Sequence, residues 1–211
     1  MKIGIFDSGK GGTTVMAAIK EKLPEAEYFY IGDSENCPYG EKSDKELMQI
    51  VTKHVETLSD WGTKIIVVAC NTATTRCIKY LRQKYPILKF VGTEPAIKLA
   101  VNSGAKKILV MATPGTVESE RTARLLKENQ KPGQEIDLLA CAGLADAIEK
   151  SDGIELKLQE LLNNIAKDYD AVVLGCTHYS LIKPKIQKYF PDAQLVDGNE
   201  GVAKQVKSLT D

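Results

Sequence analysis

The sequence predicts an α/β protein built as two similar lobes, each with a mostly parallel sheet flanked by helices. Strand and helix signals alternate along all 211 residues, which is the pattern of consecutive strand–helix–strand units. Two segments, 65–69 and 171–174, are apolar throughout. Strands covered by helices on both faces have this composition, so we expect each of the two segments to lie in the centre of a sheet.

The two apolar segments also occupy equivalent places in a repeat. Asp7 closes the first expected strand and precedes Cys70 by 63 residues (7 to 70). Thr113 follows the strand expected at 107–111 and precedes Cys176 by the same 63 residues (113 to 176). Ligands of open α/β sheets bind outside the carboxyl ends of the strands. We therefore expect both sets of strand ends to point into one shared cleft.

Element signals in the first half alternate from strand to helix. A short apolar strand at 2–6 leads through a glycine-rich turn into a helix that ends before Pro24. Ser43 and Glu46 have the spacing of a capping box and predict a helix start, and Gly62 is placed to end that helix. The expected elements are strands at 2–6, 28–31, 65–69 and 88–91, and helices at 13–23, 44–61, 71–84 and from Pro95 onward.

The second half continues the same alternation. Pro132 and Gly133 mark a loop, and leucines at helical spacing predict an amphipathic helix at 154–166. Pro184 is expected in the first turn of the next helix. The expected elements are strands at 107–111, 136–140, 170–175 and 194–196, and helices at 116–128, 144–150, 154–166, from 184 onward and at 202–209.

The composition argues against several classes of partner and site. Formal net charge is zero, with 28 basic and 28 acidic residues and no block of like charge, so neither nucleic acid nor a membrane surface is expected as a partner. The first residues do not form a signal peptide, and no apolar run approaches the roughly 20 residues of a membrane span; we expect a cytoplasmic protein. Five cysteines without a C-x-x-C pair argue against a disulfide framework, and with only two histidines we expect no metal site.

Cys70 and Cys176 are the strongest candidates for chemistry. Each lies where a strand gives way to a helix, and helix N-terminal amides favour a thiolate. Two thiols on opposite sides of one carbon can invert a stereocentre without a cofactor, because one removes a proton while the other delivers one to the opposite face. The hydrogen-bonding residues that follow them, 71–72 and 177–178, would be wasteful in a core.

The remaining candidates have simpler structural explanations. Cys77 and Cys141 are expected in the core, because free cysteine is among the most buried residue types. Cys37 lies in a polar loop that can border a cleft, whereas His54 lies on the apolar face of its helix and is expected to pack there. The glycine-rich run at 9–12 matches neither phosphate-loop pattern.

Six motifs match a known family in order along nearly the whole chain. They are IGIFDSGKGG (3–12), CPYG (37–40), VVACNTAT (67–74), GTEPA (92–96), ATPGTVES (112–119) and VLGCTHYSL (173–181). With these motifs the sequence resembles the cofactor-independent aspartate/glutamate racemase superfamily, and within it the bacterial glutamate racemases. The resemblance implies two pseudo-twofold related lobes around a glutamate site, no cofactor, and D-glutamate supply for peptidoglycan and hence for cell-wall biogenesis and cell shape.

The resemblance also assigns roles position by position. It implies Cys70 and Cys176 as the two acid/base catalysts, supported by Asp7 and His178, with Glu149 as a candidate helper near Cys176. The residues that it places against the substrate are Asp7, Ser8, Tyr39, Gly40, Asn71, Thr72, Thr113, Thr116, Thr177 and His178.

By the family pattern, the first lobe comprises residues 1–92 and 186–211, and the second comprises 93–185. The chain is shorter than is usual for the family and departs from its pattern at 33–37, 179–180 and 197–199. Three alternatives therefore stay open: a racemase for aspartate or another amino acid, a non-catalytic amino-acid-binding protein on the same scaffold, and a thiol redox protein. The missing C-x-x-C counts against the redox protein. Assembly as a homodimer also stays open.

Overall fold

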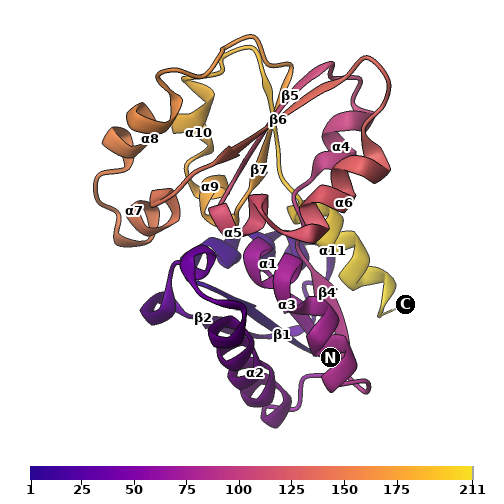
Figure 1. Cartoon of the computed structure of the whole chain (residues 1–211). Coiled ribbons are helices and arrows are strands. Elements are labelled where there is room, and N and C mark those ends of the chain that lie inside the picture. The colour runs from indigo at the N-terminus through magenta and orange to yellow at the C-terminus, as the bar shows by residue number, and fades with distance from the viewer. Residues whose placement is uncertain (211) are drawn as a thin grey trace.

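Two parallel four-stranded sheets form the centres of two lobes (Figure 1). The computed structural model describes residues 1–210. The first sheet has the order β2-β1-β3-β4 and the second the order β6-β5-β7-β8, so the same order occurs twice, which confirms the prediction of two similar α/β lobes. The strands are β1 (Lys2–Asp7), β2 (Glu27–Gly32), β3 (Ile65–Val68), β4 (Lys89–Gly92), β5 (Lys107–Ala112), β6 (Glu135–Ala140), β7 (Ala171–Gly175) and β8 (Gln194–Val196).

Helices cover both faces of the first sheet, which explains the uninterrupted apolar sequence of β3. All four β3 residues are buried; Ile66 and Val68 pack toward α2 and α3, and Ile65 and Val67 toward α1 and α11. The expected capping box of Ser43 starts α2. The helices of this lobe are α1 (Thr13–Lys22), α2 (Asp44–Asp60), α3 (Asn71–Lys84) and α11 (Asn199–Ser208).

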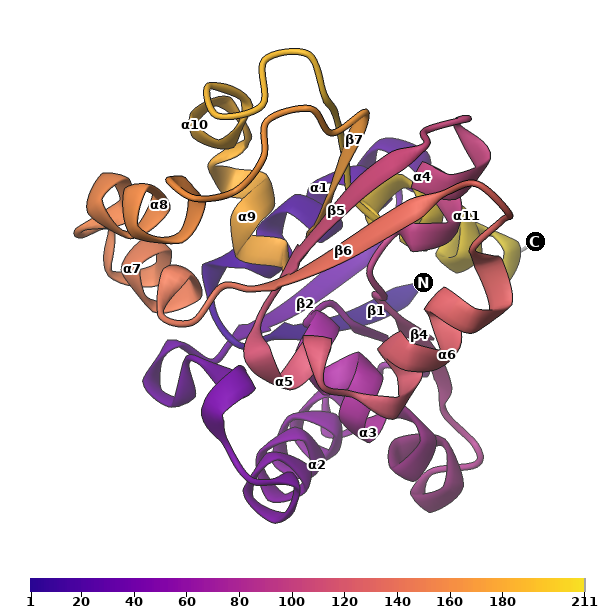
Figure 2. The ribbon, with the colours of Figure 1, turned by 45° about the horizontal axis from the view of Figure 1, so that its top comes forward.

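The second sheet is covered in the same way (Figure 2). Residues of α4 and α6 pack on one face, and residues of α7, α8, α9 and α10 pack on the other. These helices are α4 (Ile97–Asn102), α6 (Glu120–Asn129), α7 (Leu144–Lys150), α8 (Ile154–Leu162), α9 (Thr177–Leu181) and α10 (Lys183–Gln187), and the short α5 (Pro114–Val117) follows β5 directly.

Several helix boundaries differ from the sequence prediction. The single helix expected at 116–128 is two helices, because Thr113 caps α5 and Ser119 caps α6 through their side chains. The helix expected at 154–166 ends at Leu162, and α4 begins at Ile97, after Pro95. The residues after Cys176 form the short α9, as expected where the strand gives way to a helix, and the helix expected from 184 onward is the separate α10, which begins at Lys183.

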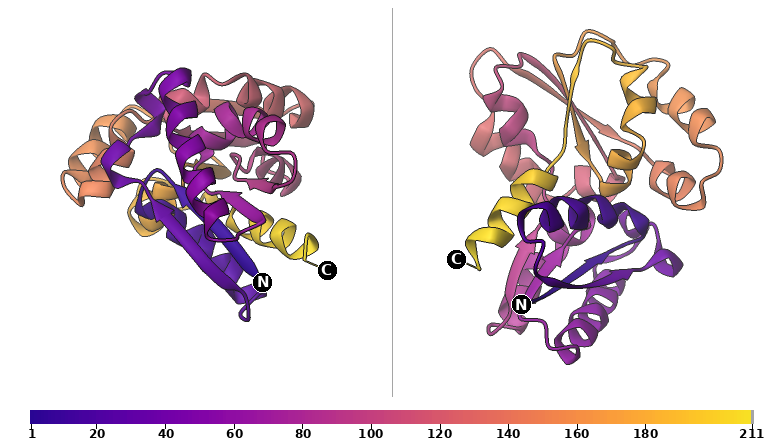
Figure 3. Two further views of the ribbon diagram at one scale, coloured as in Figure 1. Left: turned by 90° about the horizontal axis from the view of Figure 1, so that it is seen from below. Right: turned by 180° about the vertical axis from the view of Figure 1, so that it is seen from behind.

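The division into lobes needs one correction. Residues from 186 onward were expected in the first lobe, but Ile186 and Phe190 lie in the core of the second lobe and β8 pairs with β7. The chain therefore returns to the first lobe only after Val196. The last helix, α11, then packs beside α1, as the view from behind shows (Figure 3).

The strand order determines where a site can form. Open sheets of this order bind ligands outside the carboxyl ends of the strands, at the point where the order reverses. In the first sheet that point lies between β1 and β3, which end at Asp7 and just before Cys70. In the second sheet it lies between β5 and β7, next to Thr113 and Cys176.

Candidate active site

Cys70 caps the first turn of α3 and is almost fully buried, with 5% of its surface exposed. The N–H groups of Thr72 and Ala73 and the hydroxyl of Ser8 face its sulfur and favour a thiolate. Burial and the charge of Asp7 outweigh them and raise the pKa of the thiol to about 12. The neutral thiol is thus the resting form of Cys70.

Cys176 has the equivalent place in the second lobe, at the start of α9, with 7% of its surface exposed. The backbone N–H of His178 faces its sulfur, and the ring Nδ1 of the same histidine lies 3.8 Å from it. Burial, followed by the charge of Cys70, raises the pKa of this thiol well above its ordinary value. Each thiol is therefore neutral at rest, and a thiolate formed at Cys70 would raise the pKa of Cys176 further.

Asp7 joins the two lobes beside the thiols. Its carboxylate is completely buried and accepts a hydrogen bond from the Gly12 N–H at 2.9 Å. The hydroxyl of Thr177, from the second lobe, lies 3.2 and 3.3 Å from its two oxygens. Burial raises the pKa of Asp7, while His178 and these hydrogen bonds act in the opposite direction.

A backbone contact brings the lobes this close. A Cβ at Gly11 would lie 2.6 Å from both the Thr177 hydroxyl and the backbone nitrogen of His178. Only glycine lets the 3-10 turn at Lys10–Gly12 pack against α9 in this way. The glycine-rich run thus serves the contact between lobes.

A group of threonine hydroxyls forms a second contact between the lobes. Thr72 Oγ1 lies 2.8 Å from Thr113 Oγ1 and 3.1 Å from Thr116 Oγ1. Gly40 packs directly on Thr113, where a Cβ would approach to 2.9 Å. A cleft of about 630 Å³ opens at Gly40 and Gly115, outside this threonine group.

Glu149, on α7, links His178 to the first lobe. Its Oε2 lies 2.8 Å from His178 Nε2 and accepts the Lys10 N–H at 2.9 Å. The Ser34 hydroxyl donates to the other carboxylate oxygen. Burial would raise the pKa of Glu149, but the hydrogen bonds from Ser34, Lys10 and His178 outweigh burial and lower it. Glu149 is therefore ionised and held in place.

Tyr39 is anchored by two partners in the first lobe. Its buried hydroxyl donates to Asp33 Oδ2 at 2.7 Å. His54 Nε2 lies 3.0 Å from the same carboxylate oxygen and 3.1 Å from the tyrosine hydroxyl. The His54 ring also packs against Phe6, with centroids 5.7 Å apart. Packing, which the sequence predicted for His54, is accordingly only part of its role.

Comparison with known proteins identifies the family. A family model described as Asp/Glu/Hydantoin racemase matches residues 8–206. The chain belongs to this family. The glutamate racemase of Clostridium acetobutylicum is 42% identical over 99% of this chain and 84% of its own length. The resemblance noted from the motifs is thus confirmed.

Two solved structures of relatives show the same fold with ligands. The Escherichia coli glutamate racemase, solved with L-glutamate and the activator UDP-MurNAc-Ala, is 30% identical, with a TM-score of 0.88 over 99% of this chain and 81% of that one. The Francisella tularensis glutamate racemase, solved with D-glutamate, is 30% identical, with a TM-score of 0.82 over 99% and 80% of the two chains.

The structure brings the residues expected at the site into one region between the lobes. Contacts across the cleft link Asp7 to Thr177 and Thr72 to Thr113 and Thr116. The other residues expected there are Ser8, Tyr39, Asn71 and His178, which are buried, Gly40, which packs on Thr113, and Glu149, which binds His178.

Four further residues were missed as site residues. Asp33 and His54 hold Tyr39, while Lys10 and Ser34 hold Glu149. A local signal existed for Asp33, because it is a carboxylate directly after a strand that ends at the ligand-binding edge. For His54 the signal was its position as a polar residue on the apolar face of its helix.

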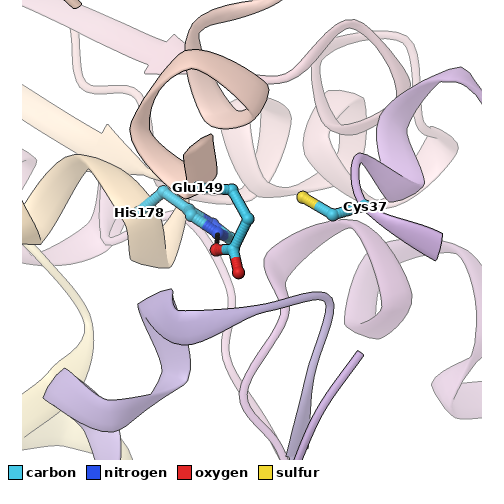
Figure 4. A group of neighbouring side chains, drawn as sticks. All are labelled: Cys37, Glu149 and His178. Carbon is cyan, nitrogen blue, oxygen red and sulfur yellow. Dashed lines mark hydrogen bonds and ion pairs between the residues drawn. The ribbon is translucent and has the colours of Figure 1, made fainter. Parts of the chain in front are cut away.

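The cysteines outside the pair divide into two kinds. Cys77 and Cys141 are buried in the cores of the two lobes, as expected. Cys37 instead faces Glu149 and His178 (Figure 4), and one potential ligand atom from each of the three lies within 4.8 Å of the others. From the sequence no metal site is expected, because the chain has only two histidines, yet the fold gathers three donors. All five cysteines carry free thiols.

None of the helices within residues 1–210 combines the length and the apolar composition needed to cross a membrane.

Proposed function

We propose that this protein is a glutamate racemase that interconverts L- and D-glutamate by proton transfer between Cys70 and Cys176, without a cofactor. The observation that carries the proposal is the placement of the two thiols. Each follows a central strand at the point where the strand order reverses, one in each lobe; both are buried, and the charge of a Cys70 thiolate would act directly on Cys176. Relatives named glutamate racemase, at 42% and 39% identity, support glutamate as the substrate.

The proposed reaction is a two-base transfer at the α-carbon of glutamate. One cysteine first gives its proton to the group beside it, Asp7 for Cys70 or His178 for Cys176, and then as thiolate takes the α-proton and becomes a thiol again. The other cysteine gives its own proton to the opposite face of the carbon and becomes the thiolate. Because both pKa values are raised by burial, the thiolate needs a cation opposite it, and the ammonium group of the substrate is suited to that role.

The remaining site residues are proposed to bind and position the substrate. Hydroxyl and amide groups of Ser8, Asn71, Thr72 and Thr177 are suited to hold its carboxylates, together with Tyr39, Gly40, Thr113 and Thr116. Asp7 and His178 each lie beside a thiol and are proposed to support proton transfer there. Glu149 orients His178 and is a positioning residue.

The biological setting is also part of the proposal. D-Glutamate made by this reaction would supply peptidoglycan synthesis, and hence cell-wall biogenesis and cell shape. We place the enzyme in the cytoplasm, where thiols stay reduced. Assembly as a homodimer stays a prediction, which sedimentation or light scattering will test.

Exchange of the α-proton with solvent deuterium tests the proposal directly. Wild-type protein should exchange and interconvert both enantiomers, which mass spectrometry and circular dichroism detect. Cys70→Ser and Cys176→Ser should each abolish interconversion, whereas Cys77→Ala, which removes a thiol from the core, should retain it. If wild-type protein leaves both enantiomers unexchanged, the proposed reaction is wrong.

A racemase for aspartate or another amino acid is the second candidate. It is favoured by one observation, the departure of residues 33–37 from the family pattern, because Ser34 and Cys37 border the site. A panel of amino acids followed by circular dichroism separates the two candidates. Tight binding of glutamate without exchange would indicate a binding protein, and formation of a Cys70–Cys176 disulfide on mild oxidation would indicate a redox protein.

A further inference from the structure

Three potential metal ligands of different kinds meet where the two lobes contact each other. A thiol comes from Cys37 in the first lobe, a carboxylate from Glu149 on α7, and an imidazole from His178 on α9. One donor atom from each lies within 4.8 Å of the other two (Figure 4). Of these residues, the proposed racemisation leaves Cys37 without a role.

The donor set matches the preferences of zinc and cadmium. Zinc sites with three protein ligands use sulfur, nitrogen and carboxylate oxygen at about 2.0–2.3 Å and keep a fourth position for water. Bonds of that length around a tetrahedral ion put neighbouring donors about 3.3–3.8 Å apart. The donors that lie up to 4.8 Å apart therefore need to approach each other by about 1 Å, whereas the 2.8 Å contact between His178 and Glu149 must open to admit the ion.

The surroundings already hold the ligands as a metal site requires. Hydrogen bonds from the groups around a site orient its ligands. Here the Ser34 hydroxyl and the Lys10 N–H fix the Glu149 carboxylate. The Lys10 ammonium itself is bound to the Glu149 carbonyl and to Ser151, and thus leaves the carboxylate available to a cation.

The local charge also favours a cation. The negative groups that act on the Cys37 sulfur are Glu149, Asp7, Asp146 and the Cys70 thiolate when it forms, and they outnumber the cation that also acts on it, Lys150. A divalent ion at this point would be attracted by these charges.

We propose that Cys37, Glu149 and His178 form an inhibitory site for a thiophilic divalent cation, Zn²⁺ or Cd²⁺. As the ion binds, the sulfur–metal bond replaces the S–H bond of Cys37 and the proton passes to the buffer. The ion takes His178 away from Glu149 and ties the first lobe to the second. The inhibition rests on the proposed racemase function, whereas the binding of the metal does not.

Cobalt binding tests the site independently of catalysis. Co²⁺ added to wild-type protein in glutamate-free buffer should bind once per chain, with a near-ultraviolet thiolate–cobalt absorption that Zn²⁺ or Cd²⁺ displaces. Cys77→Ala, the matched control, should behave like wild type. Cys37→Ala should bind Co²⁺ at least about 100-fold more weakly, and Ser34→Ala about tenfold more weakly, because loss of an orienting partner costs about 10–100-fold.

Inhibition provides the second readout. Zn²⁺ should inhibit racemisation by wild-type protein and EDTA should reverse it. Cys37→Ala should resist Zn²⁺, with a rate in the presence of Zn²⁺ close to its own metal-free rate. The proposal is overturned if Cys37→Ala binds Co²⁺ as tightly as wild type, since the ion would then lie on Cys70 and Cys176, or if wild-type protein binds none. If wild-type protein binds cobalt through Cys37, as shown by the loss of binding in Cys37→Ala, but never racemises glutamate, the metal site stands and only the proposed function is refuted.

Discussion

The substitution Glu149→Gln tests how His178 supports proton transfer at Cys176. Gln has the size of Glu and can keep the same geometry. Its amide oxygen can accept from Lys10 and His178, and its amide nitrogen can donate to the Ser34 hydroxyl, so all three partners present in the structure are retained. What disappears is the negative charge 2.8 Å from His178 Nε2.

The size of the effect follows from that one bond. A hydrogen bond to a charged group contributes about 1.5–3 kcal/mol and a neutral one about 0.5–1.5 kcal/mol. The difference, about 1–1.5 kcal/mol, applies where positive charge develops on the His178 ring during proton transfer. Since 1.36 kcal/mol corresponds to a factor of ten in rate, kcat/KM should fall about 5- to 15-fold.

Isotope effects show which step has slowed. Because enantiomers have equal free energy, kcat/KM must fall equally in both directions in any variant. Slower transfer at Cys176, however, makes that step rate-limiting in both directions. The substrate deuterium effect on kcat/KM, measured with α-deuterated L- and D-glutamate, should therefore rise for the enantiomer that Cys176 deprotonates and fall for the other.

Glu160→Gln is the matched control, because Glu160 is exposed on α8 and, within residues 1–210, pairs with Lys157 alone. It should change neither kcat/KM nor the isotope effects. The reasoning is refuted if Glu149→Gln stays within twofold of wild type. It is equally refuted if the substrate isotope effects for L- and D-glutamate both rise or both fall, since His178 would then not act on Cys176 alone.

Three further predictions concern the other contacts of the site. Burial raises the pKa of Asp7 above its unfolded value of 3.8, so the free energy of unfolding falls as pH rises from 3.8 through the folded pKa and stays lower above it. Asp7→Asn should therefore raise Tm at pH 7, by an amount that vanishes below pH 3.8. The same substitution should lower kcat at least about tenfold, because the site loses a charged hydrogen-bond acceptor. Thr72→Val removes the hydroxyl that bridges to Thr113 and should raise KM about 2- to 10-fold, since one neutral hydrogen bond contributes about 0.5–1.5 kcal/mol, with little change in Tm; an unchanged KM would show that this bridge does not help to close the lobes. Tyr39→Phe leaves Asp33 without its 2.7 Å donor and should lower the free energy of unfolding by about 1–3 kcal/mol, which urea denaturation measures.

The placement of the two thiols could be predicted because it depends on local order in the chain. A fully apolar strand followed by a cysteine, found twice, predicts two central strands. The rule that parallel strands present their carboxyl ends at one edge of the sheet then predicts that each cysteine lies at the ligand-binding edge. No knowledge of side-chain contacts was needed for Cys70 and Cys176.

The surroundings of Glu149 could not be predicted in this way. Its partners Lys10 and Ser34 are 139 and 115 residues away in sequence, and no periodicity links them. Burial of His54 was readable from helical spacing, but its bonds to Asp33 and Tyr39 depend on where the loop after β2 comes to lie. The boundary at 186 was wrong because β8 is a three-residue strand, too short to show which sheet it joins.

The repeated strand order makes the two thiols equivalent in the fold but not in chemistry. Cys70 lies near a buried carboxylate, Asp7, whose equivalent in the second lobe is Thr113. Cys176 lies beside an imidazole that is held by Glu149. Thermodynamics forbids this asymmetry from making kcat/KM unequal for the two enantiomers. It must therefore be expressed in the separate values of kcat and KM and in the isotope effects.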